Sequence, residues 1–170
     1  IILIKCKYEP VKPNLWQFAL SDITNLRHTA IRGIGKFKMQ DHLDKLIEWV
    51  NEKDIEFDEF TTIISALSYM ENEEAMNVIL SFANSPDWKK RRHVAKSLEN
   101  IYHSTSISTL RYFLSDKNDE VKKFAHSALQ TIEKMLKQQK LQFVEKTQQS
   151  GEQKEYPYQE ILELTEDIIE

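Results

Sequence analysis

Five histidines and one cysteine have the side chains most able to bind a metal or act as a nucleophile. The histidines are His28, His42, His93, His103 and His126. Two metal ligands on one helix face stand three or four residues apart, and no two of these histidines have that spacing. No histidine lies near Cys6 in the sequence, so a reactive thiol is not indicated. We therefore expect no metal, no cofactor and no catalytic residue.

The cysteine count also bears on the compartment in which the protein works. One thiol cannot form an intrachain disulfide, and a chain of this kind is typical of a reducing environment. We therefore expect a cytoplasmic protein.

The distribution of charge points to binding rather than to catalysis. The formal net charge of the 170-residue chain is −4. Residues 150–170 carry seven acids against one base, a net charge of −6, so residues 1–149 carry +2. A basic body next to an acidic tail favours contact between the body and an anionic group.

A repeat of about 31 residues must position the basic side chains. Arg27, Phe60, Arg91 and Lys122 mark its first position, at steps of 33, 31 and 31 residues. Apolar residues recur three, four, seven and ten positions after these marks, and this spacing is one face of an α-helix. His126 falls at one of these core positions, so we expect it to be a hydrogen-bonded interior residue. The chain has only three glycines and four prolines, and this low content disfavours β-hairpins. The repeated pattern predicts an all-α fold of stacked repeats.

A shorter helix is expected before each long one. Apolar stripes over 43–50, 75–82 and 107–114 predict three short helices, and a further one is expected over about 14–20. Ser21 and Asp22 are residue types that begin a helix, so they should open the first long helix. Pro86 should lie in the first turn of the third long helix, where its missing N–H costs little. The chain is thus predicted to contain about four helix pairs.

Bases on the solvent side of the long helices form what we call the basic ridge. Four of them stand one or five positions after the repeat mark, opposite the core positions, and the others stand at the mark or next to it. In the second repeat Thr61 and Ser65 interrupt them. The ridge comprises Arg27, Arg32, Lys90, Arg91, Arg92, Lys96, Lys122 and Lys123, with Tyr69 as an aromatic anchor.

Two segments resemble the second helix of a HEAT-like repeat: residues 25–35, Asn-Leu-Arg-His-Thr-Ala-Ile-Arg-Gly-Ile-Gly, and residues 119–129, with lysine in place of the arginine. The 31-residue step is similar to that of the short bacterial repeats found also in phycobilisome lyases. The resemblance covers residues 14 to about 136. It implies a right-handed α-α superhelix, an α-solenoid whose long second helices line the concave face, and usually a protein-binding scaffold. Phe60 departs from the pattern, because a base is usual there.

The same resemblance extends to two kinds of enzyme. Deoxyhypusine hydroxylase binds a di-iron centre through His-Glu dipeptides, and no histidine of this chain is followed by Glu. A protein similar to the alkylpurine DNA glycosylases of this fold would need a basic surface with aromatic side chains. Trp16, Trp49 and Trp88 could supply the aromatic side chains. The net charge of −4 argues against strong phosphate binding, so nucleic-acid binding stays the alternative.

The two ends of the chain are expected to lie outside the repeats. Residues 1–13 form an N-terminal segment whose apolar start could be the remnant of an upstream domain or membrane anchor, which would make the protein an adaptor on the cytoplasmic side of a membrane. Residues 14–138 form the repeat domain, 139–157 a polar extension and linker, and 158–170 an acidic amphipathic helix. Through its short linker, this helix could contact the basic ridge of its own chain.

These observations predict a non-catalytic scaffold. We expect it to bind another protein on the concave face of the solenoid, with an acidic surface or peptide favoured by the charge of the basic ridge.

Overall fold

The computed structural model describes residues 9–150 and 155–166, and within these ranges the chain forms helices and connecting turns with no strand. Three short 3-10 helices are η1 (Glu9–Val11), η2 (Gln40–His42) and η3 (Phe82–Asn84). The α-helices are α2 (Lys12–Ala19), α3 (Thr24–Lys36), α4 (Leu43–Val50), α5 (Phe57–Leu67), α6 (Glu73–Ser81), α7 (Trp88–Leu98), α8 (Ser104–Phe113), α9 (Asp119–Ser150) and α10 (Gln159–Glu166).

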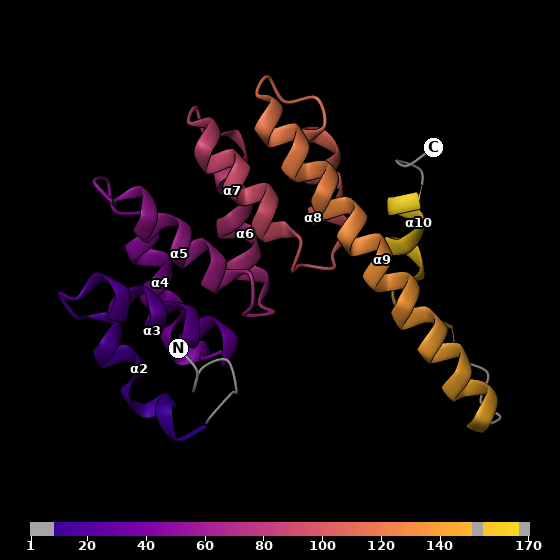
Figure 1. The fold of residues 1–170 in the computed structure, drawn as a ribbon, viewed down its shortest axis with the longest axis horizontal. Helices are drawn as coiled ribbons and strands as arrows, with labels where there is room; N and C mark the ends of the chain where they lie inside the picture. The colour runs from indigo at the N-terminus through magenta and orange to yellow at the C-terminus, as the bar shows by residue number, and fades with distance from the viewer. Residues whose placement is uncertain (1–8, 151–154, 167–170) are drawn as a thin grey trace.

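The predicted helix pairs are present. They are α2–α3, α4–α5, α6–α7 and α8–α9, and Figure 1 shows them stacked one after another, with α5, α7 and α9 side by side. Each second helix contacts the second helix of the next pair. The fold is therefore the all-α superhelix of helix pairs that the 31-residue repeat predicts.

Side chains in the turns set where several helices begin. The Asn72 side chain accepts hydrogen bonds from the first turn of α6, and Asp87 Oδ1 accepts one of 2.8 Å from the N–H of Lys89 in α7. Pro86 therefore precedes the capping residue instead of lying in the first turn. The first long helix begins at Thr24, later than expected, because Ser21 Oγ accepts from the N–H of Ile23 and holds a bend before the helix.

The repeated apolar positions form the core. Three positions after the repeat mark, Ala30, Ile63, Val94 and Ala125 are all buried, and seven positions after it, Ile34, Leu67, Leu98 and Leu129 are buried as well. Four positions after it, His126 is exposed, so its predicted interior role is wrong. Its equivalents Ile31, Ile64 and Ala95 are buried on helices that contact a following second helix, whereas α9 has no following second helix within the part of the chain the structure describes.

Helices α3 and α5 approach each other closely at Gly35. A Cβ atom added at Gly35 would lie 2.3 Å from the carbonyl oxygen of Ala66 and 2.6 Å from its Cα. These are backbone atoms that cannot rotate away, so only glycine permits this packing.

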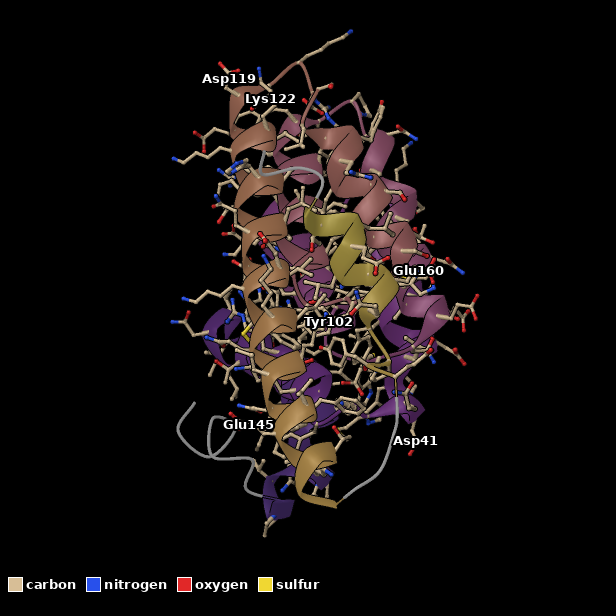
Figure 2. The ribbon with its side chains drawn as sticks, turned by 90° about the vertical axis from the view of Figure 1, so that its right-hand side faces the viewer. Asp41, Tyr102, Asp119, Lys122, Glu145 and Glu160 are labelled. Carbon is tan, nitrogen blue, oxygen red and sulfur yellow. The ribbon has the colours of Figure 1, made fainter. Side chains whose placement is uncertain are left out.

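Helix α10 folds back onto α8 and α9 and covers the end of the stack, as Figure 2 shows. Leu162 is only 2% exposed, and Ile161 and Leu164 pack against the same core. The phenol of Tyr156 donates a 3.1 Å hydrogen bond to the carbonyl of Leu136 in α9. The apolar side of α10 thus packs where a further helix pair would stack, and this burial, not charge attraction to the basic ridge, explains its position.

Of the N-terminal segment predicted over residues 1–13, positions 1–8 lie outside the described residues, and the expected membrane anchor falls there. None of the helices described is both long and apolar enough to span a bilayer.

Candidate protein-binding surface

The second helices α3, α5, α7 and α9 line one side of the stack. The contacts between successive second helices are more extensive than those between the first helices α4 and α6. The resemblance to HEAT-like repeats predicts that this side is the concave one, and this assignment stays a prediction. Every residue of the basic ridge lies on one of these helices or, for Tyr69, directly after one.

Two arginines of the ridge are held in equivalent contacts between repeats. The Arg27 side chain donates to Glu59 Oε1 of the next second helix at 2.7 Å and to the carbonyl of Ser21 at 2.8 Å. Arg91 donates two hydrogen bonds to the Asp116 carboxylate, at 2.8 and 2.9 Å, and one to the carbonyl of Ser85 at 2.7 Å. In both cases the carbonyl lies six residues before the arginine. We call these contacts the arginine clamps.

The clamps are partly buried, which strengthens them. The side chains of Arg91 and Asp116 are 15% and 6% exposed. The hydrogen bond from Arg91 lowers the pKa of Asp116 below its ordinary value, although burial acts in the opposite direction. Arg27 and Arg91 are therefore held by groups of the fold, and they are poorly placed to bind a partner.

The second repeat replaces the clamp by a ring contact. Phe60, at the position of the arginines, is fully buried, and Lys90 Nζ lies 4.7 Å from its ring centroid and 5.8 Å from that of Phe82. An ammonium group above a ring face is attracted by the negative face of the π system. Position 60 thus has no base of its own, and Lys90 of the next repeat supplies the cation at this junction.

Two further ridge residues, Arg92 and Lys122, contact neighbouring side chains. The Arg92 guanidinium lies 5.6 Å from the Trp88 ring centroid and 5.4 Å from that of Phe124 on α9. Lys122 pairs with Asp119 at 2.6 Å on its own helix.

Arg32, Lys96 and Lys123 are the exposed cations of the ridge. Arg32 contacts Thr62 of α5 only at 3.5 Å, the limit of a hydrogen bond. Tyr69 is 37% exposed, and Lys36 Nζ lies 5.9 Å from its ring centroid. These exposed side chains, together with Arg92, make up the accessible part of the predicted surface.

The sequence interpretation missed a half-buried histidine within this surface. His93 Nε2 lies 3.0 Å from Ser65 Oγ and 2.8 Å from the carbonyl of Thr61, so it links α7 to α5. Burial is the main cause that lowers the pKa of His93 to about 4. Thr61 and Ser65 interrupt the row of bases in the sequence, and two polar residues at these positions were the available signal for the contact.

A stack of helix pairs in which each second helix contacts the second helix of the next pair defines an α-solenoid of the repeat-protein class. The family model of HEAT repeats matches residues 61–130 and 76–151, which together exceed half of the chain. The chain belongs to the HEAT repeat family.

Similar solved structures have low sequence identity to this chain. An engineered protein matches at 16% identity with a TM-score of 0.50, over 90% of this chain and 78% of that one. The complex of CpcE and CpcF of phycocyanin lyase from Nostoc sp. PCC7120 matches at 16% identity with a TM-score of 0.46, over 72% of this chain and 67% of that one. No curated protein matches the chain. At this identity, the likeness to the engineered protein shows the fold alone.

Proposed function

We propose that this chain is a non-catalytic scaffold that binds an acidic segment of another protein along the accessible part of the basic ridge. The observation that carries the proposal is that Arg32, Lys96 and Lys123 are exposed on the second helices α3, α7 and α9, while Arg27 and Arg91 are already paired between repeats. A row of unpaired cations on the inner side of a solenoid complements a row of carboxylates.

Charge alone would make this binding weak. Exposed ion pairs contribute about 0–1 kcal/mol each, so several must act together and an apolar anchor is needed. Tyr69 supports such an anchor because its ring is exposed beside Lys36. The favoured ligand is therefore an acidic segment that also carries an apolar or aromatic side chain.

The test uses a fluorescent peptide that alternates glutamate with leucine, and a variant in which Arg32, Lys96 and Lys123 are changed to Glu. These residues are exposed and outside the arginine clamps, so the variant should melt as the wild type does. We expect the peptide to bind the wild type at 50 mM salt and to lose at least tenfold in affinity in the variant.

The control variant makes the same change of charge away from the ridge, with Lys45, Lys53 and Lys146 changed to Glu; all three are exposed. An equal loss of peptide affinity in both variants would mean that only net charge matters, and the basic ridge would not be the binding site. A 20-base-pair DNA duplex is titrated in parallel. Tighter binding of DNA than of the peptide, with a steep dependence on salt, would favour the nucleic-acid alternative instead.

A further inference from the structure

The solvent side of α7 carries a continuous line of three bases. Lys89, Arg92 and Lys96 follow one another at steps of three and four residues, so they lie along one face of the helix. Lys89 and Lys96 are exposed, and Arg92 is half-buried. We call these three residues the α7 stripe.

The α7 stripe differs from the equivalent positions of the other second helices. These positions hold Asn25, His28 and Arg32 on α3, Asp58, Thr61 and Ser65 on α5, and Glu120, Lys123 and Ser127 on α9. Three bases in line therefore occur on α7 alone among the four second helices described. The positive charge is concentrated on one helix and is not spread evenly along the stack.

Two aromatic rings hold Arg92, the central base of the stripe. Its guanidinium lies 5.6 Å from the ring centroid of Trp88, one turn earlier on α7, and 5.4 Å from that of Phe124 on α9. Within residues 9–150 and 155–166 these rings are the contacts found for the guanidinium, and no acceptor takes a hydrogen bond from it. Its N–H groups are thus able to donate to a ligand.

The preceding arginine shows the opposite arrangement. Arg91 donates to the Asp116 carboxylate and to the carbonyl of Ser85, so the fold itself uses its N–H groups. Arg92 is held in position without such acceptors. An arginine of this kind loses little side-chain freedom when an oxyanion binds, and it is therefore well prepared to bind one.

The surroundings of Arg92 add positive charge. Burial is the main cause that lowers the pKa of His93, and the charges of Lys96 and Arg92 lower it further, so both cations act on this part of α7. Lys123, the equivalent of Arg92 in the next repeat, is exposed on α9 and directly precedes Phe124 in the sequence. An anion at Arg92 is therefore attracted by more than one cation.

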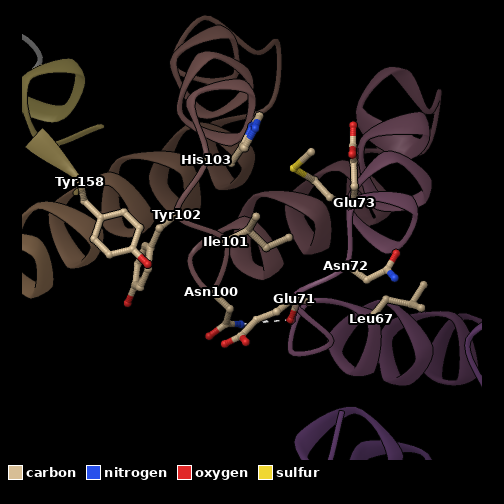
Figure 3. Close-up of a pocket in the computed structure, with 11 residues that line it drawn as sticks. Leu67, Glu71, Asn72, Glu73, Asn100, Ile101, Tyr102, His103 and Tyr158 are labelled. Atoms are coloured by element: carbon tan, nitrogen blue, oxygen red, sulfur yellow. Dashed lines mark hydrogen bonds between the residues drawn. The ribbon is translucent and has the colours of Figure 1, made fainter. Parts of the chain in front are cut away.

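The α7 stripe ends where a cavity begins. Asn100, four residues after Lys96, lines a cavity of about 370 Å³ between the turns that follow α5 and α7, as Figure 3 shows. Among the described residues its lining includes Glu71 and Glu73 and contains no lysine or arginine. These carboxylates repel an anion, so the favoured position for an anion lies around Arg92.

We infer that the α7 stripe binds a phosphoryl group, carried by a phosphorylated side chain of the acidic partner segment. Near pH 7 a phosphoryl group on a side chain has a charge of about −1.5 to −2 and three acceptor oxygens. It can accept two parallel hydrogen bonds from Arg92 while the Lys96 and Lys123 ammonium groups neutralise its remaining charge. The inference rests on the proposed function, because it specifies the chemistry of the same partner.

A phosphorylated protein segment fits this surface better than a nucleic acid does. A nucleic-acid strand presents a phosphate at every nucleotide and is held by bases along its whole path. On α5, the helix next to α7, the stripe positions are Asp58, Thr61 and Ser65, so the bases do not continue in that direction. One phosphoryl group matches one basic stripe.

The test measures the binding of three fluorescent peptides to the full chain at 150 mM salt. All three alternate glutamate with leucine, and their central residue is serine, phosphoserine or glutamate. We expect the phosphoserine peptide to bind at least tenfold more tightly than the serine peptide and at least threefold more tightly than the glutamate peptide. A duplex of 20 base pairs and inorganic phosphate are tested as competitors.

The outcomes separate this inference from the proposed function. Equal affinity for all three peptides would overturn the phosphoryl site and leave the proposed function standing. Binding of the phosphoserine peptide alone would support the phosphoryl site and show that carboxylates are not sufficient. If no peptide binds, both proposals are wrong. Displacement of the phosphoserine peptide by an equal concentration of the duplex or of inorganic phosphate would overturn the assignment to a protein segment.

Variants locate the site on α7. Arg92→Lys keeps the charge but removes the planar group, and it should weaken binding of the phosphoserine peptide at least fivefold and of the serine peptide less than twofold. Phe124→Leu keeps every charge and removes one ring, and it should also reduce the preference for phosphoserine. Lys146→Gln, at an exposed position far along α9, is the control and should change neither affinity. An unchanged preference for phosphoserine in Arg92→Lys would contradict the inference.

Discussion

Lys90 Nζ lies 4.7 Å from the ring centroid of Phe60, at the level of the stack where the neighbouring repeats use an arginine and a carboxylate. Arg27 joins the first repeat to the second and Arg91 joins the third to the fourth. The Lys90–Phe60 contact joins the second to the third. Each junction between repeats is therefore bridged by a cation, although the partner of that cation changes.

The Lys90–Phe60 contact should stabilise the stack modestly. Lys90→Met keeps the length of the side chain and removes the charge, and we expect it to lower the free energy of unfolding by about 0.5–1 kcal/mol. Lys89→Met, a change at the exposed neighbour, is the control and should have almost no effect. Urea denaturation of both variants measures the difference. Equal values would mean that the ring contact contributes nothing.

The second arginine clamp should contribute more. Arg91→Gln leaves the Asp116 carboxylate, 6% exposed, without its main partner, and should cost about 1.5–3 kcal/mol. The pKa of Asp116 is lowered in the folded protein, so its stabilisation is present above the ordinary pKa of a carboxyl and is lost as the pH falls through the folded value. Denaturation between pH 5 and pH 2 should therefore show a smaller acid-induced loss in the variant, and an unchanged loss would contradict the clamp. Lys96→Gln, at an exposed position of the same helix, serves as the control.

Half-buried His93 should make stability depend on pH in mildly acid solution. The unfolded chain binds a proton at this residue below about pH 6.5, whereas the folded protein binds it only near pH 4. The free energy of unfolding should thus rise with pH across this window, by about 3 kcal/mol in total. His93→Gln should remove this rise. Because the pKa of His42 is also lowered, the measure is the difference between wild type and variant at each pH. A constant difference from pH 4 to pH 7 would contradict the prediction.

The contact between α3 and α5 should not tolerate any side chain at position 35. Gly35→Ala would place a methyl group against the backbone of Ala66, so the helices must separate, at a cost of about 1–3 kcal/mol. An alanine in a helix is otherwise favoured over glycine by about 1 kcal/mol, so a lower melting temperature would be clear evidence of the clash. An unchanged or higher melting temperature would contradict it.

The fold could be predicted from the sequence because it depends on a local, repeated pattern. Buried Ile63, Leu67 and Leu98 follow directly from the 3.6-residue period, and so do the helix pairs. The pattern was wrong at His126, because periodicity identifies the side of a helix that faces its neighbours and cannot say where the neighbours end.

The candidate surface could be predicted only in part. The positions of the bases were evident, but their partners were not, because Glu59 and Asp116 lie 32 and 25 residues away from the arginines they bind. A charge pattern cannot separate Arg91, which is held in a clamp, from exposed Lys96 one turn later. The contact of α10 with α8 and α9 could not be predicted, since it depends on where the chain turns back after α9.

The position of α10 has a consequence for self-association. The last repeat of a stack exposes an apolar side to which a second copy of the protein could bind. Because this contact is head to tail and does not close into a ring, further copies could add without limit. Here Leu162 and its neighbours fill that flank from within the same molecule. Helix α10 therefore covers the side of α8 and α9 to which a second copy would bind. Filament growth through this side would first require α10 to dissociate from α8 and α9.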